Sequence, residues 1–196
     1  LLDVARIAQD KLVLRKTRTD LADAVRQAVE ANAATADARG LRLDVRPPAR
    51  RLTVDADPAR LAQVVSNLIH NAVKYAPEGG HVDVTLGCDG DRAVVAVRDD
   101  GPGIAPDLIG RVFDLFAQGD HGVDRADGGL GIGLTLVRRL VEMHGGNVEV
   151  ESAPGRGATF RVRLPLLDGA EIETPAADAR GEGVAPPLRV LVVDDN

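Results

Sequence analysis

The order of apolar and polar positions along the chain predicts alternating helices and strands. Apolar residues recur at helical spacing in five segments, which are 1–14, 21–40, 57–76, 106–116 and 135–144. Apolar and polar residues alternate, or apolar residues run together, as strands require in seven segments, which are 41–45, 52–54, 82–86, 93–97, 148–150, 160–164 and 188–193. These elements predict an α+β fold, a two-layer α/β sandwich with helices on one face of a mixed, mostly antiparallel sheet.

Local signals indicate where several of these elements begin and end. Asp20 is a candidate N-cap for the second helix, and Asp57 with Pro58 at the first helical position is a clear start for the third. Asp89-Gly90 predicts a hairpin turn between two strands. Residues 168–187 are rich in Ala, Gly, Glu and Pro without periodicity, which indicates a linker between domains.

Composition narrows the class of protein. Aromatic residues make up only 2% of the 196 residues, so the core must be aliphatic. The net charge of -6, without a basic stripe, argues against a nucleic-acid partner. The single cysteine, Cys88, favours a reducing, cytoplasmic compartment. No apolar run approaches the ~20 residues of a membrane helix, so we expect no membrane contact by these residues. Because the chain starts at Leu1 rather than Met, we expect a piece of a longer protein.

Residues 128–134 read GGLGIGL and lead directly into a predicted helix. A glycine-rich turn at a helix N-terminus offers free N–H groups to an anion such as phosphate. A plain tight turn explains the glycines equally well, and both interpretations stay open on this segment alone. A dinucleotide-binding fingerprint is excluded because the spacing is GxGxG after a polar loop, and a P-loop because no Gly-Lys-Ser/Thr occurs.

A polar stripe on the predicted helix 57–76 is the second candidate feature. Asn67, Asn71 and Lys74 are spaced i, i+4 and i+7, so they share one helix face. Two amides and an ammonium could bind Mg²⁺ through oxygen and phosphates through Lys. The alternative is a solvated face, although asparagine is a poor helix former.

A carboxylate at a strand end is the third candidate feature. Asp99 follows an apolar strand and precedes Gly101 and Gly103, which would let a ligand approach the backbone. A partly buried carboxylate only accepts hydrogen bonds, so it requires a donor such as an amino group. An ordinary Asp-Gly turn is the alternative.

Two of the three phenylalanines, Phe113 and Phe116, lie in the segment VFDLF. They precede residues 118–128, which are polar and glycine-containing and so predict a mobile loop. We interpret the phenylalanines as a hydrophobic anchor for one end of that loop.

Four segments together resemble a known family. NLIHNAVKY, DDGPGI, VFDLF and GGLGIGL, in this order and spacing, are similar to the N, G1, F and G2 boxes of sensor histidine kinase ATP-binding domains. The resemblance extends to about Leu166 and implies the Bergerat fold. It also implies ATP and Mg²⁺ as ligands.

The resemblance implies roles for individual residues. Asn67, Asn71 and Lys74 would be catalytic, with Asn71 ligating Mg²⁺ and Lys74 meeting the phosphates. Tyr75 would pack near the nucleotide, and Asp99 would accept from the adenine amino group.

The remaining ATP-binding positions implied by the resemblance fall in three loops. The adenine pocket would include Gly101, Gly103 and Ile104. The phosphate side would include Gly129, Leu130, Gly131, Ile132, Gly133 and Leu134. Phe113 and Phe116 would anchor a lid at roughly 117–128. In that lid Arg125 is either a γ-phosphate contact or a solvated loop residue.

The flanking segments resemble neighbouring domains of a hybrid sensor kinase. Residues 1–16 resemble the end of a dimerisation and phosphotransfer helix, and 188–196 the first strand of a receiver domain. The ATP-binding domain would occupy 17–167. We therefore expect these two domains as partners, a homodimer in the full-length protein, and relay to a receiver Asp. Membrane anchoring of the parent through other segments is left open.

No phosphoacceptor segment is found around the four histidines, His70, His81, His121 and His144. None lies in the expected His-Glu-x-x-Arg-Thr-Pro context, so the acceptor would lie upstream. At the end of its predicted helix, His144 is expected to carry a partly positive imidazole that suits the helix dipole.

Two other functions remain open. A mechanical ATPase of the same fold would carry a Glu four residues before the metal-binding Asn, where this chain has Asn67, and an amide is no useful base. A non-enzymatic, nucleotide-gated docking module cannot be distinguished by sequence from a kinase domain that lacks its acceptor.

Overall fold

The computed structural model describes residues 12–114 and 132–167. Its helices and strands, in chain order, are β1 (Thr17–Asp20), α2 (Leu21–Ala38), β2 (Arg42–Arg46), β3 (Thr53–Ala56), α3 (Pro58–Tyr75), β4 (His81–Asp89), β5 (Arg92–Asp99), α4 (Pro106–Ile109), α5 (Gly133–Met143), β6 (Asn147–Ser152) and β7 (Ala158–Pro165). None of the helices in the described ranges is long and apolar enough to cross a membrane.

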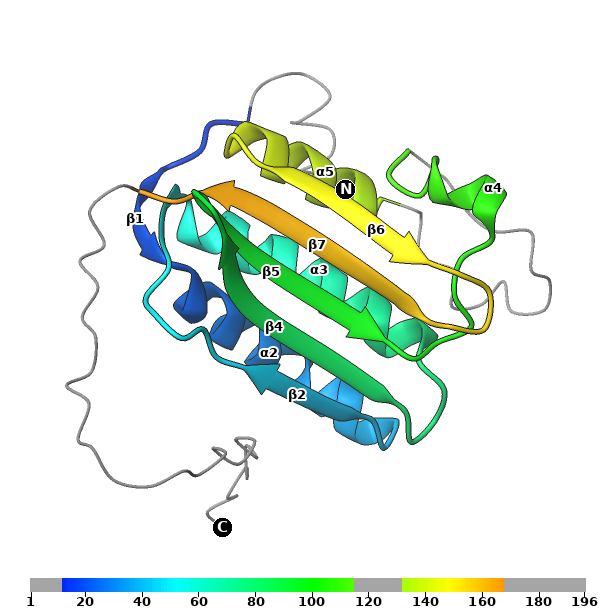
Figure 1. Ribbon diagram of the computed structural model, residues 1–196. Coiled ribbons are helices and arrows are strands. Elements are labelled where there is room, and N and C mark those ends of the chain that lie inside the picture. The colour runs from blue at the N-terminus through cyan, green and yellow to red at the C-terminus, as the bar shows by residue number, and fades with distance from the viewer. Residues whose placement is uncertain (1–11, 115–131, 168–196) are drawn as a thin grey trace, which may run out of the picture.

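A five-stranded sheet forms one layer and the helices form the other. The strand order is β2-β4-β5-β7-β6, in which only the β2–β4 pair is parallel. Helices α2, α3 and α5 all pack on one face, and no helix of the described residues covers the other face of the sheet (Figure 1). The predicted two-layer sandwich with a mixed, mostly antiparallel sheet is confirmed.

The core lies between these layers and is aliphatic, as the composition predicts. In β4 and β5, alternate residues such as Val82, Val84 and Val95 are buried, and their neighbours point to the face without helices. Helix α3 turns a stripe of seven residues inward, which are Leu61, Val64, Val65, Leu68, Ile69, Ala72 and Val73.

Several predicted elements differ in extent. The helix predicted over 106–116 ends at Ile109. After it, Arg111 N and Asp114 N bond to carbonyls three residues back rather than four, so the chain continues as turns. Residues 12–14 are not helical, which contradicts that part of the predicted helix over 1–14. The remainder of that helix, Phe116, the linker and the strand at 188–193 lie outside the described residues.

Strand β1 was not predicted. Only Thr19 in it is buried, so it shows no apolar alternation in sequence. It pairs antiparallel with β3, and the Thr19 hydroxyl donates to the Ala56 carbonyl at 3.1 Å. This small ladder fixes the starts of α2 and α3 side by side.

Polar groups at the starts of α2 and α3 are closely paired, and we call this the capped end of the sandwich. Asp20 accepts from Ala22 N, and Asp57 accepts from Arg60 N, so both predicted N-caps are confirmed. Asp57 also accepts from Arg15 N at 2.9 Å, and its own N–H donates to His144 Nε2 at 3.0 Å.

The expectation of a positive His144 is wrong. Its Nε2 accepts from Asp57 N, and its Nδ1 lies 2.7 Å from the Leu140 carbonyl, so both ring nitrogens are used by the neutral imidazole. Burial lowers the pKa of His144, outweighing the hydrogen bond to Leu140, which raises it. Desolvation therefore dominates the helix dipole at this position.

Candidate nucleotide-binding site

Several of the described residues proposed from sequence lie at the opposite end of the sandwich, which we call the open end. The carboxyl ends of α3 and β5 and the amino end of α5 lie at the same side of the molecule (Figure 1). The loop after β5 touches α3 directly, since a Cβ on Gly101 would lie 2.8 Å from the Tyr75 carbonyl oxygen. The three segments thus meet at one end although Tyr75, Asp99 and Gly133 lie 24 and 34 residues apart in sequence.

Asp99 is the buried charge of this end, with a residue exposure of 6%. Its Oδ1 accepts from Gly101 N at 2.9 Å and from Ala158 N at 3.2 Å. Its Oδ2 makes no hydrogen bond to any described residue. Burial raises the pKa of Asp99, although the two N–H donors act in the opposite direction. One carboxylate oxygen is thus held in place while the other remains able to accept from a ligand.

The loop that carries Asp99 is tied to the turn between β6 and β7. A Cβ on Gly103 would lie 2.0 Å from the Ala153 carbonyl oxygen, and one on Gly157 would lie 2.0 Å from the Asp99 carbonyl oxygen. Ser152 Oγ accepts from Ile104 N and donates to the Gly157 carbonyl. Close backbone contact therefore requires glycine at 101 and 103, a structural reason that stands beside their expected place in an adenine pocket.

The predicted stripe on α3 is partly buried. Asn67, Asn71 and Lys74 all have intermediate exposure, which is unlike a fully solvated face. Asn67 Nδ2 is buried and has no hydrogen-bond partner among the described residues. Lys74 Nζ lies 5.1 Å from the centre of the Tyr75 ring, and Tyr75 is 57% exposed. An amide donor, a cation and an open aromatic ring are thus available along one face.

The N–H groups in the first turn of α5 have no partner within the helix. Its first backbone bond runs from Leu136 N to Ile132 O, so the N–H groups at 133–135 have no partner within the helix. Ile132 at the N-cap position supplies no side-chain hydrogen bond, in contrast to Asp20 and Asp57. Such an end favours an anion.

Other predicted positions are only partly covered. Phe113 is half-buried and packs edge-on against Phe160, with ring centres 6.2 Å apart, as a hydrophobic anchor would. The candidates that lie outside the described residues are Phe116, Arg125, Gly129, Leu130 and Gly131.

Sequence reasoning missed three residues that support the site. Arg39 at the end of α2 donates to the carbonyls of Val73, Lys74 and Ala76, which satisfies the last turn of α3. Ser152 and Gly157 hold the loop after Asp99, as described above. No local pattern marks these residues, because the partners of Arg39 lie 34 to 37 residues away and Ile104, which donates to Ser152, lies 48 residues away.

Comparison with known proteins identifies the family to which this fold and candidate site belong. Residues 56–168 match the family model described as histidine kinase-, DNA gyrase B- and HSP90-like ATPase. The chain therefore belongs to this family of ATP-binding domains. Its relatives further define it as a histidine kinase catalytic domain.

Two curated relatives illustrate the similarity. The histidine protein kinase DivJ of Caulobacter vibrioides is 39% identical over 167 residues, which is 85% of this chain and 28% of DivJ. The circadian input-output histidine kinase CikA of Synechococcus elongatus is 44% identical over 110 residues, which is 56% of this chain and 15% of CikA. The chain thus spans under a third of either relative.

A solved structure extends the comparison to a nucleotide complex. Full-length ShkA in complex with AMPPNP superposes with a TM-score of 0.75 and 34% sequence identity, covering 86% of this chain and 35% of ShkA. The mycobacterial sensor histidine kinase MprB, with a TM-score of 0.67 and 28% identity, matches 76% of this chain and 98% of its own.

Proposed function

We propose that this domain holds Mg-ATP at its open end and presents the γ-phosphoryl group to a histidine of a dimerisation and phosphotransfer domain. The observation that carries the proposal is Asp99, a buried carboxylate with one oxygen fixed and one available. An adenine amino group is a donor of the kind this oxygen requires. A buried acceptor also discriminates against bases that lack the donor.

Each remaining group at the open end has a complementary part of ATP. Lys74 and the N–H groups at the start of α5 would bind phosphate oxygens, together with Gly129, Gly131 and Gly133 of the glycine run. Tyr75 would cover the nucleotide, and Arg125 would approach the γ-phosphate. Asn67 Nδ2, buried without a partner in the described ranges, would donate to a phosphate oxygen or a bound water.

Mg²⁺ is the metal that the family implies, and the donors present fit it. Asn71 lies on the same partly exposed stripe as Lys74 and supplies one neutral oxygen. Phosphate oxygens and water would supply the other ligands, which is the usual way that Mg²⁺ is held. When bound, the ion neutralises part of the charge on the phosphates.

Phosphoryl transfer would then depend mainly on positioning. An imidazole nitrogen of the external histidine forms a bond to the γ-phosphorus while the bond from phosphorus to the leaving ADP oxygen breaks. Asp99 orients the base end, and Lys74 and the α5 amides stabilise charge at the phosphate end. Asn67 cannot take a proton from water, which favours transfer to the histidine over hydrolysis and so over a mechanical ATPase.

The wider context is a hybrid sensor kinase that acts as a homodimer. Residues 188–196, which resemble a receiver strand, suggest relay from the histidine to a receiver Asp. Partial coverage of DivJ and CikA is consistent with further domains in the parent. A cytoplasmic location follows from the need for ATP.

The first test is Asp99→Asn, with Asp100→Asn as matched control. The amide keeps an oxygen for Gly101 N and Ala158 N but replaces the free acceptor by a donor. We expect ATP affinity in calorimetric titration to fall by roughly 10- to 150-fold, the loss of about 1.5–3 kcal/mol for a hydrogen bond to a charged group. The melting temperature at pH 7 should hold or rise, because burial raises the Asp99 pKa and ionisation therefore costs stability.

A second measurement separates kinase from docking module. The chain is incubated with γ-³²P-ATP and the dimerisation domain of its parent. Acid-labile label should appear on that domain and not on the chain alone. ATP binding without any transfer would favour the docking module, whereas unchanged ATP affinity in Asp99→Asn would overturn the adenine assignment itself.

A further inference from the structure

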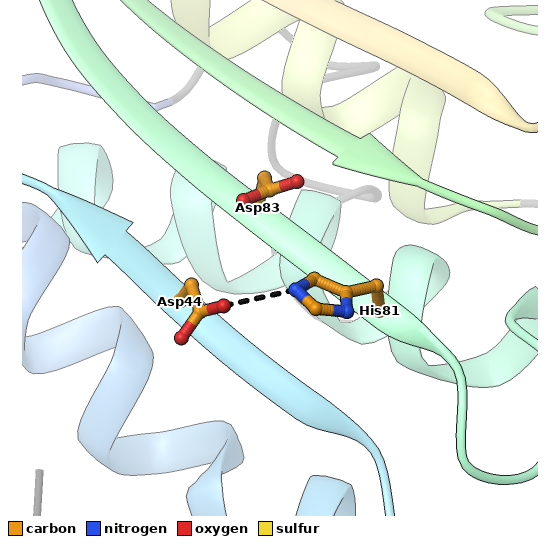
Figure 2. Close-up of side chains that lie close together, drawn as sticks. All are labelled: Asp44, His81 and Asp83. Atoms are coloured by element: carbon orange, nitrogen blue, oxygen red, sulfur yellow. Dashed lines mark hydrogen bonds and ion pairs between the residues drawn. The ribbon is translucent and has the colours of Figure 1, made fainter. Parts of the chain in front are cut away.

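Three side chains of the kinds that can bind a metal gather on the face of the sheet opposite α2, α3 and α5. Asp44 comes from β2, and His81 and Asp83 come from β4 (Figure 2). The parallel register places Asp44 directly beside Asp83. His81, two residues before Asp83 on the same strand, shares its face. The intervening Val82 is fully buried under the helices, so these three side chains lie on the opposite side of the sheet from α3.

The spacing of the three side chains suits a small cation. One donor atom from each lies within 4.8 Å of the others, and His81 Nε2 is 2.9 Å from Asp44 Oδ2. An ion with N and O ligands at ~2.1 Å holds neighbouring donors roughly 3.0–3.5 Å apart. The His81–Asp44 pair, at 2.9 Å, is already close to this spacing. A side-chain rotation that moves the Asp83 carboxylate by about an ångström or two would bring the third donor into range.

Electrostatics at this cluster also favours a cation. Two carboxylates abreast on neighbouring strands repel each other. The side chains of Asp44 and Asp83 are only 28% and 25% exposed, so water and salt screen this repulsion incompletely. Arg46 lies 3.4 Å from Asp83, but it is 72% exposed and contributes little as a surface pair. A divalent ion would compensate both carboxylates at once.

We propose that Asp44, His81 and Asp83 form a binding site for a divalent transition-metal ion of the Zn²⁺ class, distinct from the Mg-ATP site. An imidazole with two carboxylates selects Zn²⁺, Co²⁺, Ni²⁺ or Cu²⁺ over Mg²⁺ and Ca²⁺, which prefer oxygen ligands alone. Nε2 gives its lone pair to the ion, and the ring hydrogen moves to Nδ1. His81 is 38% exposed on its side chain, so water can accept from Nδ1.

The bound ion would tie together the edge of the sheet. Among the described strands, β2 is at the edge of the sheet and pairs with β4 alone, over five residues. A metal that links Asp44 to His81 and Asp83 therefore adds cross-strand bonds where the sheet has one neighbour. Binding to the folded chain should raise the melting temperature with ion concentration.

The test is calorimetric titration of the tag-free, nucleotide-free chain with ZnCl₂, and separately with MgCl₂. We expect one Zn²⁺ per chain, bound far more tightly than Mg²⁺, with a rise in melting temperature. Asp44→Asn should weaken Zn²⁺ binding by about tenfold or more, as loss of a coordinating group does. Because the amide still accepts from His81 and removes the repulsion with Asp83, the metal-free melting temperature should hold.

His81→Ala and His70→Ala form a matched pair of histidine variants. His70 is exposed on α3 and lies outside the cluster, so its replacement should leave Zn²⁺ affinity within about twofold, while His81→Ala should weaken it by about tenfold or more. Visible absorption of Co²⁺ should show imidazole ligation that His81→Ala abolishes. Equal Zn²⁺ binding by both histidine variants, or Zn²⁺ binding no tighter than Mg²⁺, would show that the three residues are an ion-pair network only.

Discussion

The capped end and the open end of the sandwich treat their polar groups in opposite ways. At the capped end, Asp57 accepts from two backbone N–H groups and donates its own N–H to His144. At the open end, Thr135 Oγ1 in the first turn of α5 is buried without a partner in the described ranges, and α5 lacks a side-chain cap. Asn67 Nδ2, midway along α3, is likewise buried without a partner in the described ranges. Polar groups at the capped end therefore pair with one another and stabilise the fold. At the open end some polar groups have no partner in the described ranges, which leaves them available to a ligand.

The pKa values of two buried aspartates, Asp57 and Asp99, shift in opposite directions at the two ends. Burial alone would raise the pKa of Asp57, but N–H groups from Arg15 and Arg60 outweigh it and hold that pKa below 3.8. Burial raises the pKa of Asp99 above 3.8 in spite of its two N–H donors. Ionised Asp57 therefore stabilises the fold above pH 3.8, whereas ionised Asp99 costs stability there.

The largest effect on stability is expected from Gly157→Ala. This variant tests whether the turn between β6 and β7 holds Asp99 in place at the open end. Gly157 has φ +68°, and a Cβ there would meet the Asp99 carbonyl at 2.0 Å. We expect a loss of about 3 kcal/mol in unfolding free energy, from the positive φ and the forced backbone shift together. ATP affinity should fall as well, because Asp99 must move.

Gly155→Ala is the matched control in the same turn. Gly155 has φ +73° but nothing within 4 Å of its Cβ position, so only the conformational cost of about 1–2 kcal/mol should appear. Denaturant unfolding and ATP titration of both variants separate close contact from backbone strain. Equal losses in the two variants would mean that the turn does not support Asp99.

A smaller effect is expected from Asp57→Ala, which tests whether the two ends are independent. Loss of the N-cap of α3 should lower the unfolding free energy by about 1–2 kcal/mol. ATP affinity should stay within about twofold, because α3 ends at the open end, a full helix length away. Asp55→Ala, an exposed acid on β3, is the control. A tenfold loss of ATP affinity in Asp57→Ala alone would show that the ends are coupled.

Features carried by local periodicity could be predicted from the sequence. The α3 helix with its Asp57 cap and the β4–β5 hairpin follow from spacing and turn residues, and the structure has them. β1 could not be predicted, because it has no apolar alternation of its own. It forms by pairing with β3, in which Thr17 lies opposite Ala56. The length of α4 was also missed, because α-helical spacing continues past Gly110 in sequence.

Candidate site residues could be recognised from the four boxes, whereas the groups that hold them in place could not. Asp99 is visible at a strand end, but its fixed Oδ1 depends on Ala158 N, 59 residues later. Arg39 supports the end of α3 from another helix. The sequence also suggested the wrong charge for His144. The helix end is visible in the local sequence, whereas the burial that lowers the His144 pKa depends on segments distant along the chain.

The smallest effect on stability is expected from a change at His144, which tests whether its imidazole is neutral or positive. Its neighbours are the Leu140 carbonyl, the Asp57 N–H, and the charges of Lys16, Asp57 and Asp55. Because burial lowers the His144 pKa below 6.5, its contribution to stability is complete above pH 6.5. As pH falls below 6.5, the unfolded chain takes up the proton first and that contribution is lost.

Urea unfolding of the wild-type chain and of His144→Gln at pH 7.5 and pH 5.5 measures this loss. The other three histidines are the same in both proteins, so the difference between the two proteins isolates His144. We expect the advantage of the wild type to shrink at pH 5.5. A positive imidazole at the end of α5 would instead enlarge that advantage at low pH, since the helix dipole would then favour the charged form. Whether the stability advantage of the wild type shrinks or grows at low pH therefore shows whether desolvation or the helix dipole dominates. A smaller advantage at pH 5.5 means that the capped end depends on a neutral His144.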